Sequence, residues 1–267
     1  MQRNTNAIKQ ASNLFAFVMN NPTRWLDPWG LFAWNEADDH WFALRHEVEN
    51  AGGSVSWNAR TYTATASIFG VSVSFARGSD GVRITNNRMY VRADTFYSTV
   101  VNAAREMVFL GAHGGVARHN PVPHLHISMF ISENSRYWSD SAFADNTRWG
   151  NVRFATISGG ASRSIHVISV INSMNYLDRA GLRFVNHLYT GTGMITQLFE
   201  AHNHFMDNHS RSFNYALLPA RRAPAFNSTS MVISLLNAIE LDHRMTNSQR
   251  RFAIGIGSEI HPRNFGR

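Results

Sequence analysis

The sequence predicts an α+β protein in which a small antiparallel β module comes before a domain with a central antiparallel sheet and packed helices. Three observations lead to this prediction. Apolar residues make up 44% of the chain and aromatic residues 12%, which is enough to fill a core. Segments that alternate between apolar and polar residues occur beside segments with helical spacing. No internal repeat is present, which excludes a solenoid or a propeller.

The composition excludes several kinds of chemistry. The 267 residues contain no cysteine, so the chain has no disulfide, no thiolate metal site, no iron–sulfur cluster and no thiol nucleophile. Covalent catalysis would therefore use oxygen or nitrogen. The net charge of +7 is scattered along the chain and does not favour a specific nucleic-acid partner. No uncharged apolar run is long enough for a membrane helix, and the polar first ten residues are unlike a signal peptide.

Residues 12–31 contain a short apolar run and two turn signals. Leu14, Phe15, Phe17 and Val18 predict a strand, and two punctuated turns follow it, at Asn20-Asn21-Pro22 and at Asp27-Pro28-Trp29-Gly30-Leu31. This order of motifs closely resembles the end of the Rhs/YD-repeat core, where a variable toxin follows the last repeat. In that family the chain is often cut after the final leucine, which places the expected cleavage between Leu31 and Phe32.

The Rhs resemblance implies a biological role. Residues 1–31 would be a core remnant, and the remaining chain would be a polymorphic toxin effector. Such a protein is secreted or delivered by a bacterium and acts in or on a target cell. Its expected partners are an Rhs-type shell or delivery machinery and a cognate immunity protein.

Residues 32–110 form the second predicted unit. Apolar residues at helical spacing predict an amphipathic helix that ends at Gly52-Gly53. Residues 54–96 alternate with a period of two, which predicts antiparallel strands joined by Asn58-Ala59-Arg60 and by Gly78-Ser79-Asp80-Gly81. Residues 96–110 have the pattern of a helix, which the glycines from Gly111 onward would break.

The β-rich part of this unit is similar to the small stalk-like domain named after the N-terminus of copper amine oxidase. The similarity implies a surface or spacer role and does not imply copper. The matching residues are Gly52, Val55, Trp57, Thr61, Thr63, Thr65, Asn86, Arg88, Tyr90 and Val91.

Residues 111–267 form the third predicted unit. Strands are predicted at residues 124–131, at 153–160, where the strand closes in a glycine turn, and at 165–171. Helices are predicted at residues 194–206 and from residue 231 onward. Strict alternation places His124, His126 and Ser128 on one face of the first strand.

The start of the last helix has two interpretations. Ser228 or Ser230 would lie at the positive end of the helix dipole, which stabilises developing negative charge. Asn and Ser are also preferred N-cap residues, and capping alone explains them. The dipole contributes about 1 kcal/mol. A serine therefore needs a histidine partner to act as a nucleophile near neutral pH.

The order of these segments resembles the circularly permuted papain-like hydrolases of the NlpC and lecithin:retinol acyltransferase type. The motifs are a histidine strand, FATISGG, LFEAHNHFMDN and NSTSMVISLLNA, within about residues 120–240. By this resemblance His126 takes the place of the family histidine, and Ser228 takes the place of the nucleophilic cysteine. Asn227, Thr229 and Ser230 would flank the oxyanion position at the helix start.

The resemblance implies acyl transfer without a cofactor. His126 would remove the proton from Ser228, whose oxygen would attack an amide or ester of a cell-wall peptide, a protein or a phospholipid. Membrane contact follows only if the substrate is lipid. Thr156, Ser158 and His166 are the candidates for orienting the imidazole of His126, and His166 is included in the predicted catalytic set.

Other functions remain open from the residues alone. A metal-dependent hydrolase could use a histidine cluster, although no HExxH motif occurs; the candidate ligands are His113, His119, His124 and His126, with His202, His204 and His209. A two-histidine phosphodiesterase is a third enzyme class, but the second motif at His166 is one residue out of step. A papain-like shell with weak or no activity could serve as a binding module, with Arg221-Arg222 and the basic C-terminal tail contacting an acidic partner.

Overall fold

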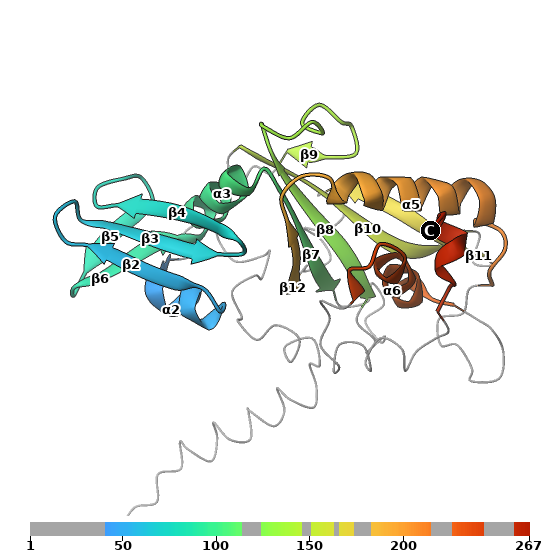
Figure 1. The fold of residues 1–267 in the computed structure, drawn as a ribbon, viewed down its shortest axis with the longest axis horizontal. Helices are drawn as coiled ribbons and strands as arrows, with labels where there is room; N and C mark the ends of the chain where they lie inside the picture. Colours follow the sequence, from blue (N-terminus) through green and yellow to red (C-terminus); the bar gives the residue numbers. More distant parts are fainter. Residues whose placement is uncertain are drawn as a thin grey trace, which may run out of the picture.

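The computed structural model describes residues 41–113, 124–145, 151–162, 166–173, 183–214, 226–242 and 259–267 (Figure 1). It has an α+β fold with antiparallel sheets, which confirms the predicted α+β class but does not confirm the circularly permuted papain-like arrangement. The Rhs-like segment at residues 12–31 and the expected cleavage between Leu31 and Phe32 lie outside the described residues.

The N-terminal part contains two three-stranded antiparallel sheets, in the orders β1-β6-β5 and β2-β3-β4. Helix α2 lies close to both sheets, and α3 leads on to the larger sheet (Figure 1). The elements are β1 (Trp41–Ala43), α2 (Leu44–Asn50), β2 (Ser54–Asn58), β3 (Thr63–Ile68), β4 (Val71–Ala76), β5 (Val82–Thr85), β6 (Arg88–Arg92) and α3 (Ala93–Ala104). The predicted antiparallel strands and both predicted turns are therefore present.

The alternation in this part has a direct physical cause. Ala64, Ala66 and Ile68 of β3 point into the core, while the polar residues between them face outward. Asn86 and Asn87 join β5 to β6 with φ of 51° and 58°. Asparagine tolerates this left-handed backbone, which suits the tight hairpin that connects the two strands.

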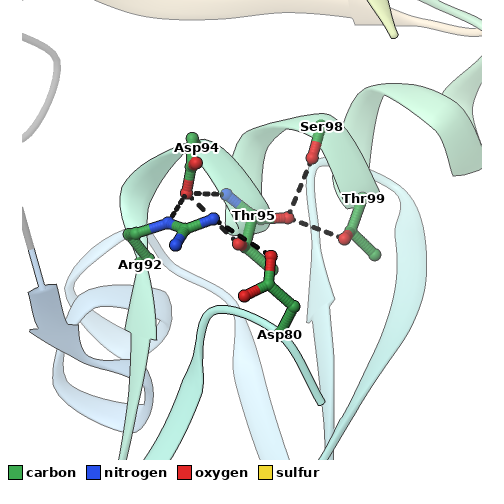
Figure 2. A network of polar contacts seen from close by, with 6 residues as sticks. All are labelled: Asp80, Arg92, Asp94, Thr95, Ser98 and Thr99. Atoms are coloured by element: carbon green, nitrogen blue, oxygen red, sulfur yellow. Dashed lines mark hydrogen bonds and ion pairs between the residues drawn. The ribbon is translucent and has the colours of Figure 1, made fainter. Parts of the chain in front are cut away.

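A polar network fixes the junction between β6 and α3 (Figure 2). The Arg92 Nε donates to Asp94 Oδ1 at 2.6 Å, and a second guanidinium nitrogen donates to Asp80 at 3.2 Å. The same Asp94 oxygen accepts the backbone N–H of Thr95 in the first turn of the helix. Asp94 therefore neutralises Arg92 and also satisfies a helix N–H that would otherwise lack a partner.

The C-terminal part is built on an antiparallel sheet in the order β11-β10-β8-β7-β12, with the short β9 paired to β10. Helices α5 and α6 pack on one face, because their apolar residues share a core with alternate residues of the strands. Helix α3 packs on the other face. The elements are β7 (Glu106–His113), β8 (His124–Ser132), β9 (Ala144–Asp145), β10 (Val152–Ser162), β11 (His166–Ser173), β12 (Arg183–Thr190), α5 (Met194–His209), α6 (Ser228–Ala238) and the short 3₁₀ helix η3 (Pro262–Phe265).

The helix predicted over residues 96–110 is wrong in its second half. Helix α3 ends at Ala104, Arg105 has φ of 67°, and β7 starts at Glu106. Met107 and Phe109 enter one core while Val108 and Leu110 enter the other. A strand that is buried on both faces is apolar throughout, so its sequence lacks the alternation that marks a half-buried strand.

The glycine turn predicted after residue 158 is also wrong. Strand β10 continues through Gly159 and Gly160 to Ser162, and it pairs with β11 from Ala155 to Ser162. Gly159 is needed for close packing, because an added Cβ would lie 2.5 Å from the Cα of Ser228. Strand β12 completes the other edge of the sheet, and no strand is predicted there from the sequence.

The two cores meet at the large sheet. One consists of apolar residues beneath α5 and α6. The other joins the N-terminal sheets to Phe109, Phe130 and Phe154 on the opposite face. The second core therefore crosses the predicted domain boundary between residues 110 and 111. Among the described helices, none is long and apolar enough to span a membrane.

Candidate active site

The start of α6 gathers the four predicted residues Asn227, Ser228, Thr229 and Ser230, all buried. Asn227 is the N-cap, and its Oδ1 accepts the backbone N–H of Ser230 at 2.8 Å. The Asn227 N–H donates in turn to the Ser230 hydroxyl at 3.4 Å, which completes a capping box. Asn227 and Ser230 therefore cap the helix, as the capping interpretation of the sequence predicted.

Ser228 is the first residue of α6 and packs directly on β10. Its Cα and carbonyl oxygen would each lie 2.5 Å from a Cβ added to Gly159. Ser228 is 5% exposed. The positive end of the α6 dipole is therefore held against the sheet at Gly159.

His126 lies on the other face of that sheet. In β8 it is directly opposite Ser158 of β10, so the two side chains share a face. Gly159, the next residue along β10, points to the opposite face, where α6 packs. No register shift interrupts the pairing of β8 with β10. The sheet therefore separates His126 from Ser228.

This placement corrects the predicted catalytic pair, because a histidine on one side of a sheet cannot take a proton from a serine on the other. His126 is fully buried, and its imidazole lies against Gly111 of β7, where an added Cβ would overlap with Nε2. Glycine at this position leaves room for the ring. The contact between His126 and Gly111 is thus a packing contact on the face of the sheet that α3 covers.

The candidates for orienting His126 are only partly brought together. Thr156 and Ser158 lie opposite Ser128 and His126, so the four side chains form a polar row on one sheet face. His166 pairs with Ser162, four residues beyond Ser158 along β10. Ser158 is the residue opposite His126, and four residues at about 3.3 Å each separate Ser158 from Ser162 by about 13 Å along β10. His166 is therefore too far from His126 to orient its imidazole.

A serine–histidine pair that the sequence analysis did not identify lies on the α6 side. His202 Nδ1 of α5 is 2.7 Å from Ser169 Oγ of β11. The backbone N–H of Ser169 also donates to the sulfur of Met206, one turn further along α5. Ser169 is 2% exposed and His202 is half-buried. Ser169 is therefore fixed by two contacts to α5, and the partly exposed member of the pair is His202.

The pair adjoins the start of α6. Ser169 is directly opposite Gly159 in the register of β10 and β11, and such residues have Cα atoms about 4.5–5.5 Å apart. Gly159 in turn touches the backbone of Ser228. Ser169 and Ser228 therefore lie on the same face of the sheet, each next to Gly159, and His202 contacts Ser169 on that face.

The environment of His202 favours the neutral imidazole. Burial lowers the pKa of His202 below its ordinary value of 6.5, while the negative charge of Asp207 opposes this shift. A neutral ring has a nitrogen lone pair and can accept a proton from a serine hydroxyl. Asp207 favours the imidazolium that such a transfer would create.

A signal for this pair was present in the sequence. Ile195, Leu198 and Phe205 line the buried stripe of α5, and His202 falls on the same stripe at helical spacing. A polar residue on a core stripe needs a polar partner. The partner could not be predicted, because Ser169 lies on a strand whose position depends on the whole sheet.

The described residues give no support for a metal centre. Within those ranges, no group of three or more His, Asp or Glu side chains is arranged to hold a metal ion. His113 and His124 are paired in register across β7 and β8. His119 lies outside the described residues.

No protein-family model, no curated protein and no solved structure matches this chain.

Proposed function

We propose that this chain is a serine-dependent acyl hydrolase or acyltransferase whose reaction takes place between β11, α5 and the start of α6. The observation that carries the proposal is the 2.7 Å contact between Ser169 Oγ and His202 Nδ1 beside the N-terminus of α6. A nucleophile, a base and a source of positive potential are the minimum set for acyl transfer.

The proposed reaction begins with proton transfer. His202 Nδ1 takes the proton of Ser169, and the Ser169 oxygen attacks the carbonyl carbon of an ester or amide. The negative charge that develops on the carbonyl oxygen is stabilised by the positive end of α6. His202 then gives its proton to the leaving alcohol or amine, which breaks the acyl bond and leaves an acyl-serine.

The second half of the reaction determines whether the enzyme is a hydrolase or an acyltransferase. Neutral His202 takes a proton from the acceptor, whose oxygen or nitrogen attacks the acyl carbon. The bond from that carbon to Ser169 Oγ then breaks, and His202 returns the proton to the Ser169 oxygen. Water as acceptor gives hydrolysis, and an alcohol or amine gives acyl transfer. Asp207 helps in both halves because its charge favours the transient imidazolium of His202.

The Rhs-like order of motifs in residues 12–31 supports a wider role as a bacterial polymorphic toxin effector. The proposed substrates are amides or esters of cell-wall peptides, proteins or phospholipids. A cognate immunity protein would block the site until the effector reaches its target. The proposed nucleophile is Ser169 and not Ser228, the residue at the position where the papain-like resemblance places the family cysteine.

The test is expression of variants inside a bacterium. The unmodified chain should arrest growth, and Ser169→Ala or His202→Ala should each restore it. His204→Ala is the matched control on the same helix, because its ring lies against His209 and Gly266, away from Ser169. Continued arrest by the His202→Ala variant contradicts the proposal, and relief of arrest by a metal chelator favours a metal-dependent enzyme.

A further inference from the structure

A groove of about 1090 Å³ lies in the N-terminal part, remote in sequence from the serine–histidine pair. It is bounded by α2, by the strands β2 and β3, and by the turn between β5 and β6. Leu44 and Ala64, which are buried, form an apolar floor. The volume suits a ligand of several rings.

The groove is the uncovered end of an apolar sheet face. Trp57, Ala64 and Phe75 lie in one row across β2, β3 and β4, with their side chains on the core face. Phe75 is 3% exposed, but Trp57 is 44% exposed. An indole on the core face of a sheet that remains open to solvent indicates a surface made to be covered.

A second aromatic ring stands beside the indole. Tyr62 is 50% exposed, and its ring centroid lies 6.4 Å from that of Trp57 with the planes 74° apart. Tyr62 has φ of 52°, which is an unfavourable backbone for a bulky residue. In the described chain, these two rings are the large apolar side chains that are exposed. Such a backbone persists only where the surrounding structure imposes it, and Tyr62 lines the groove.

The polar lining is mainly basic but not uniformly so. Arg45, Arg77 and Arg88 line the groove, together with a single carboxylate, Glu49. Arg45 is paired with Glu49 at 3.1 Å. Arg77 lies 5.3 Å above the Tyr62 ring, which leaves its fork of N–H groups available at the rim. The groove can therefore neutralise about two negative charges on a ligand.

Uncharged hydrogen-bonding groups complete the lining. The side chains of Asn86 and Asn87 project from the hairpin turn at the groove edge. Each amide offers both donors and an acceptor, and Glu49 adds acceptors. Such a mixture matches a ligand that carries many hydroxyl groups and few charges.

We propose that this groove binds an acidic oligosaccharide, with the C–H face of a sugar ring packed on Trp57 and carboxylates held by Arg77 and Arg88. A sugar ring fits an indole face, and a carboxylate fits a guanidinium fork. A single-stranded nucleic acid fits less well, because it carries a charge on every nucleotide while Arg77 and Arg88 are the groove arginines that are not paired with Glu49. The proposal is independent of the acyl-transfer site and would give the protein a means of attachment to a glycan.

The test is calorimetric titration of the full chain with three probes. The first is a hexasaccharide that alternates glucuronic acid and N-acetylglucosamine, the second is the neutral hexamer of N-acetylglucosamine, and the third is the oligonucleotide dT12. We expect the acidic hexasaccharide to bind with a Kd of about 100 μM or tighter. The neutral hexamer should bind about tenfold more weakly, because it leaves both arginines without an anion.

Substitutions in the groove test whether the oligosaccharide binds there. Trp57→Ala should weaken binding about tenfold or more, with Trp57→Phe intermediate, since it keeps an aromatic face. Arg77→Gln and Arg88→Gln should each cost about threefold or more at low salt, and less as salt is added. Arg60→Gln is the matched control, because Arg60 is equally exposed but does not line the groove.

The proposal is overturned if the acidic hexasaccharide does not bind at 1 mM, if the neutral hexamer binds equally well, or if dT12 binds more tightly. Unchanged binding by the Trp57→Ala variant would also overturn it. Circular dichroism of each variant separates loss of the site from loss of the fold. Because growth arrest by Ser169 and His202 is measured separately, failure here leaves the acyl-transfer proposal intact.

Discussion

At the scale of single residues, the proposed chemistry depends on the state of His202. Its half-buried imidazole forms a hydrogen bond with the Ser169 hydroxyl, and burial lowers the pKa of His202 below 6.5. The folded protein therefore holds a neutral base under conditions where a free histidine is partly protonated. The same shift means that His202 contributes stability above pH 6.5 that is lost as the pH falls toward the folded pKa.

The first prediction concerns the pH dependence of His202. The acidic midpoint of kcat/KM, and the NMR titration of the His202 ring, should both lie below pH 6.5. Asp207→Asn should lower the midpoint further, because the Asp207 charge raises this pKa. A midpoint at or above 6.5, or an upward shift in the Asp207→Asn variant, contradicts the environment described for His202.

The second prediction concerns Gly159, where the start of α6 packs closely on β10. An added Cβ would lie 2.5 Å from two backbone atoms of Ser228 and 2.8 Å from Met231 Cβ. Gly159→Ala should therefore lower the free energy of unfolding by about 2–3 kcal/mol and displace the helix start.

The measurement is urea denaturation, with Gly193→Ala as the comparison. Nothing lies within 4 Å of a Cβ added at Gly193, whose φ is 101°. In Gly193→Ala the free energy of unfolding should fall by about 1–2 kcal/mol, because only the left-handed backbone conformation is unfavourable for alanine. Equal losses at the two glycines would mean that α6 does not pack on β10 as described.

At the scale of elements, α6 depends on its capping box. Asn227 accepts the Ser230 N–H at 2.8 Å while 4% exposed, so its loss would leave a buried N–H without this partner.

The third prediction follows from this cap. Asn227→Ala should lower the free energy of unfolding by about 1–2 kcal/mol, and Asn227→Ser should lose less because serine also caps helices. Thermal unfolding of both variants measures the difference. If alanine and serine are equivalent here, Asn227 does not act as the cap.

The strands show how far the sequence predicts the fold. Alternation identified β3, β4 and β8, because each has one polar and one apolar face or a regular polar row. It failed for β7, whose residues are buried on both faces. The position of Gly159 inside β10 also escaped prediction, since only the approach of α6 explains a glycine there.

The catalytic pairing failed for a related reason. Alternation correctly places His126 and Ser128 on one face of β8. Which face α6 covers depends on the register across β10, and a change of one residue exchanges the two faces. The sequence could therefore identify the α6 start as a feature, but could not predict that His202 and not His126 shares its side of the sheet.

At the scale of the whole molecule, the N-terminal part and the large sheet share a core. The Phe69 ring in the β3–β4 turn lies 5.5 Å from that of Phe109 in β7 and 4.7 Å from that of His187 in β12. Phe109, Phe130 and Phe154 extend this core across the sheet. A boundary placed between residues 110 and 111 would cut β7 in two, although β7 pairs with both β8 and β12.

The fourth prediction tests this continuity. A chain that begins at residue 111 should show no cooperative unfolding transition, because it lacks half of β7 and the aromatic contacts to Phe109. A chain that begins at residue 41 keeps every described element and should unfold cooperatively. Circular dichroism during heating distinguishes them. Cooperative unfolding of the shorter chain would show that the two parts are independent domains.

The most direct test of the central claim is labelling of the purified chain with a fluorophosphonate, which reacts covalently with activated serines. Mass spectrometry then identifies the labelled residue. The account predicts a single label on Ser169, which is lost in His202→Ala and kept in His204→Ala. No labelling, labelling of Ser228 or another serine, or a label that persists in His202→Ala would contradict the claim that Ser169 and His202 form the catalytic pair.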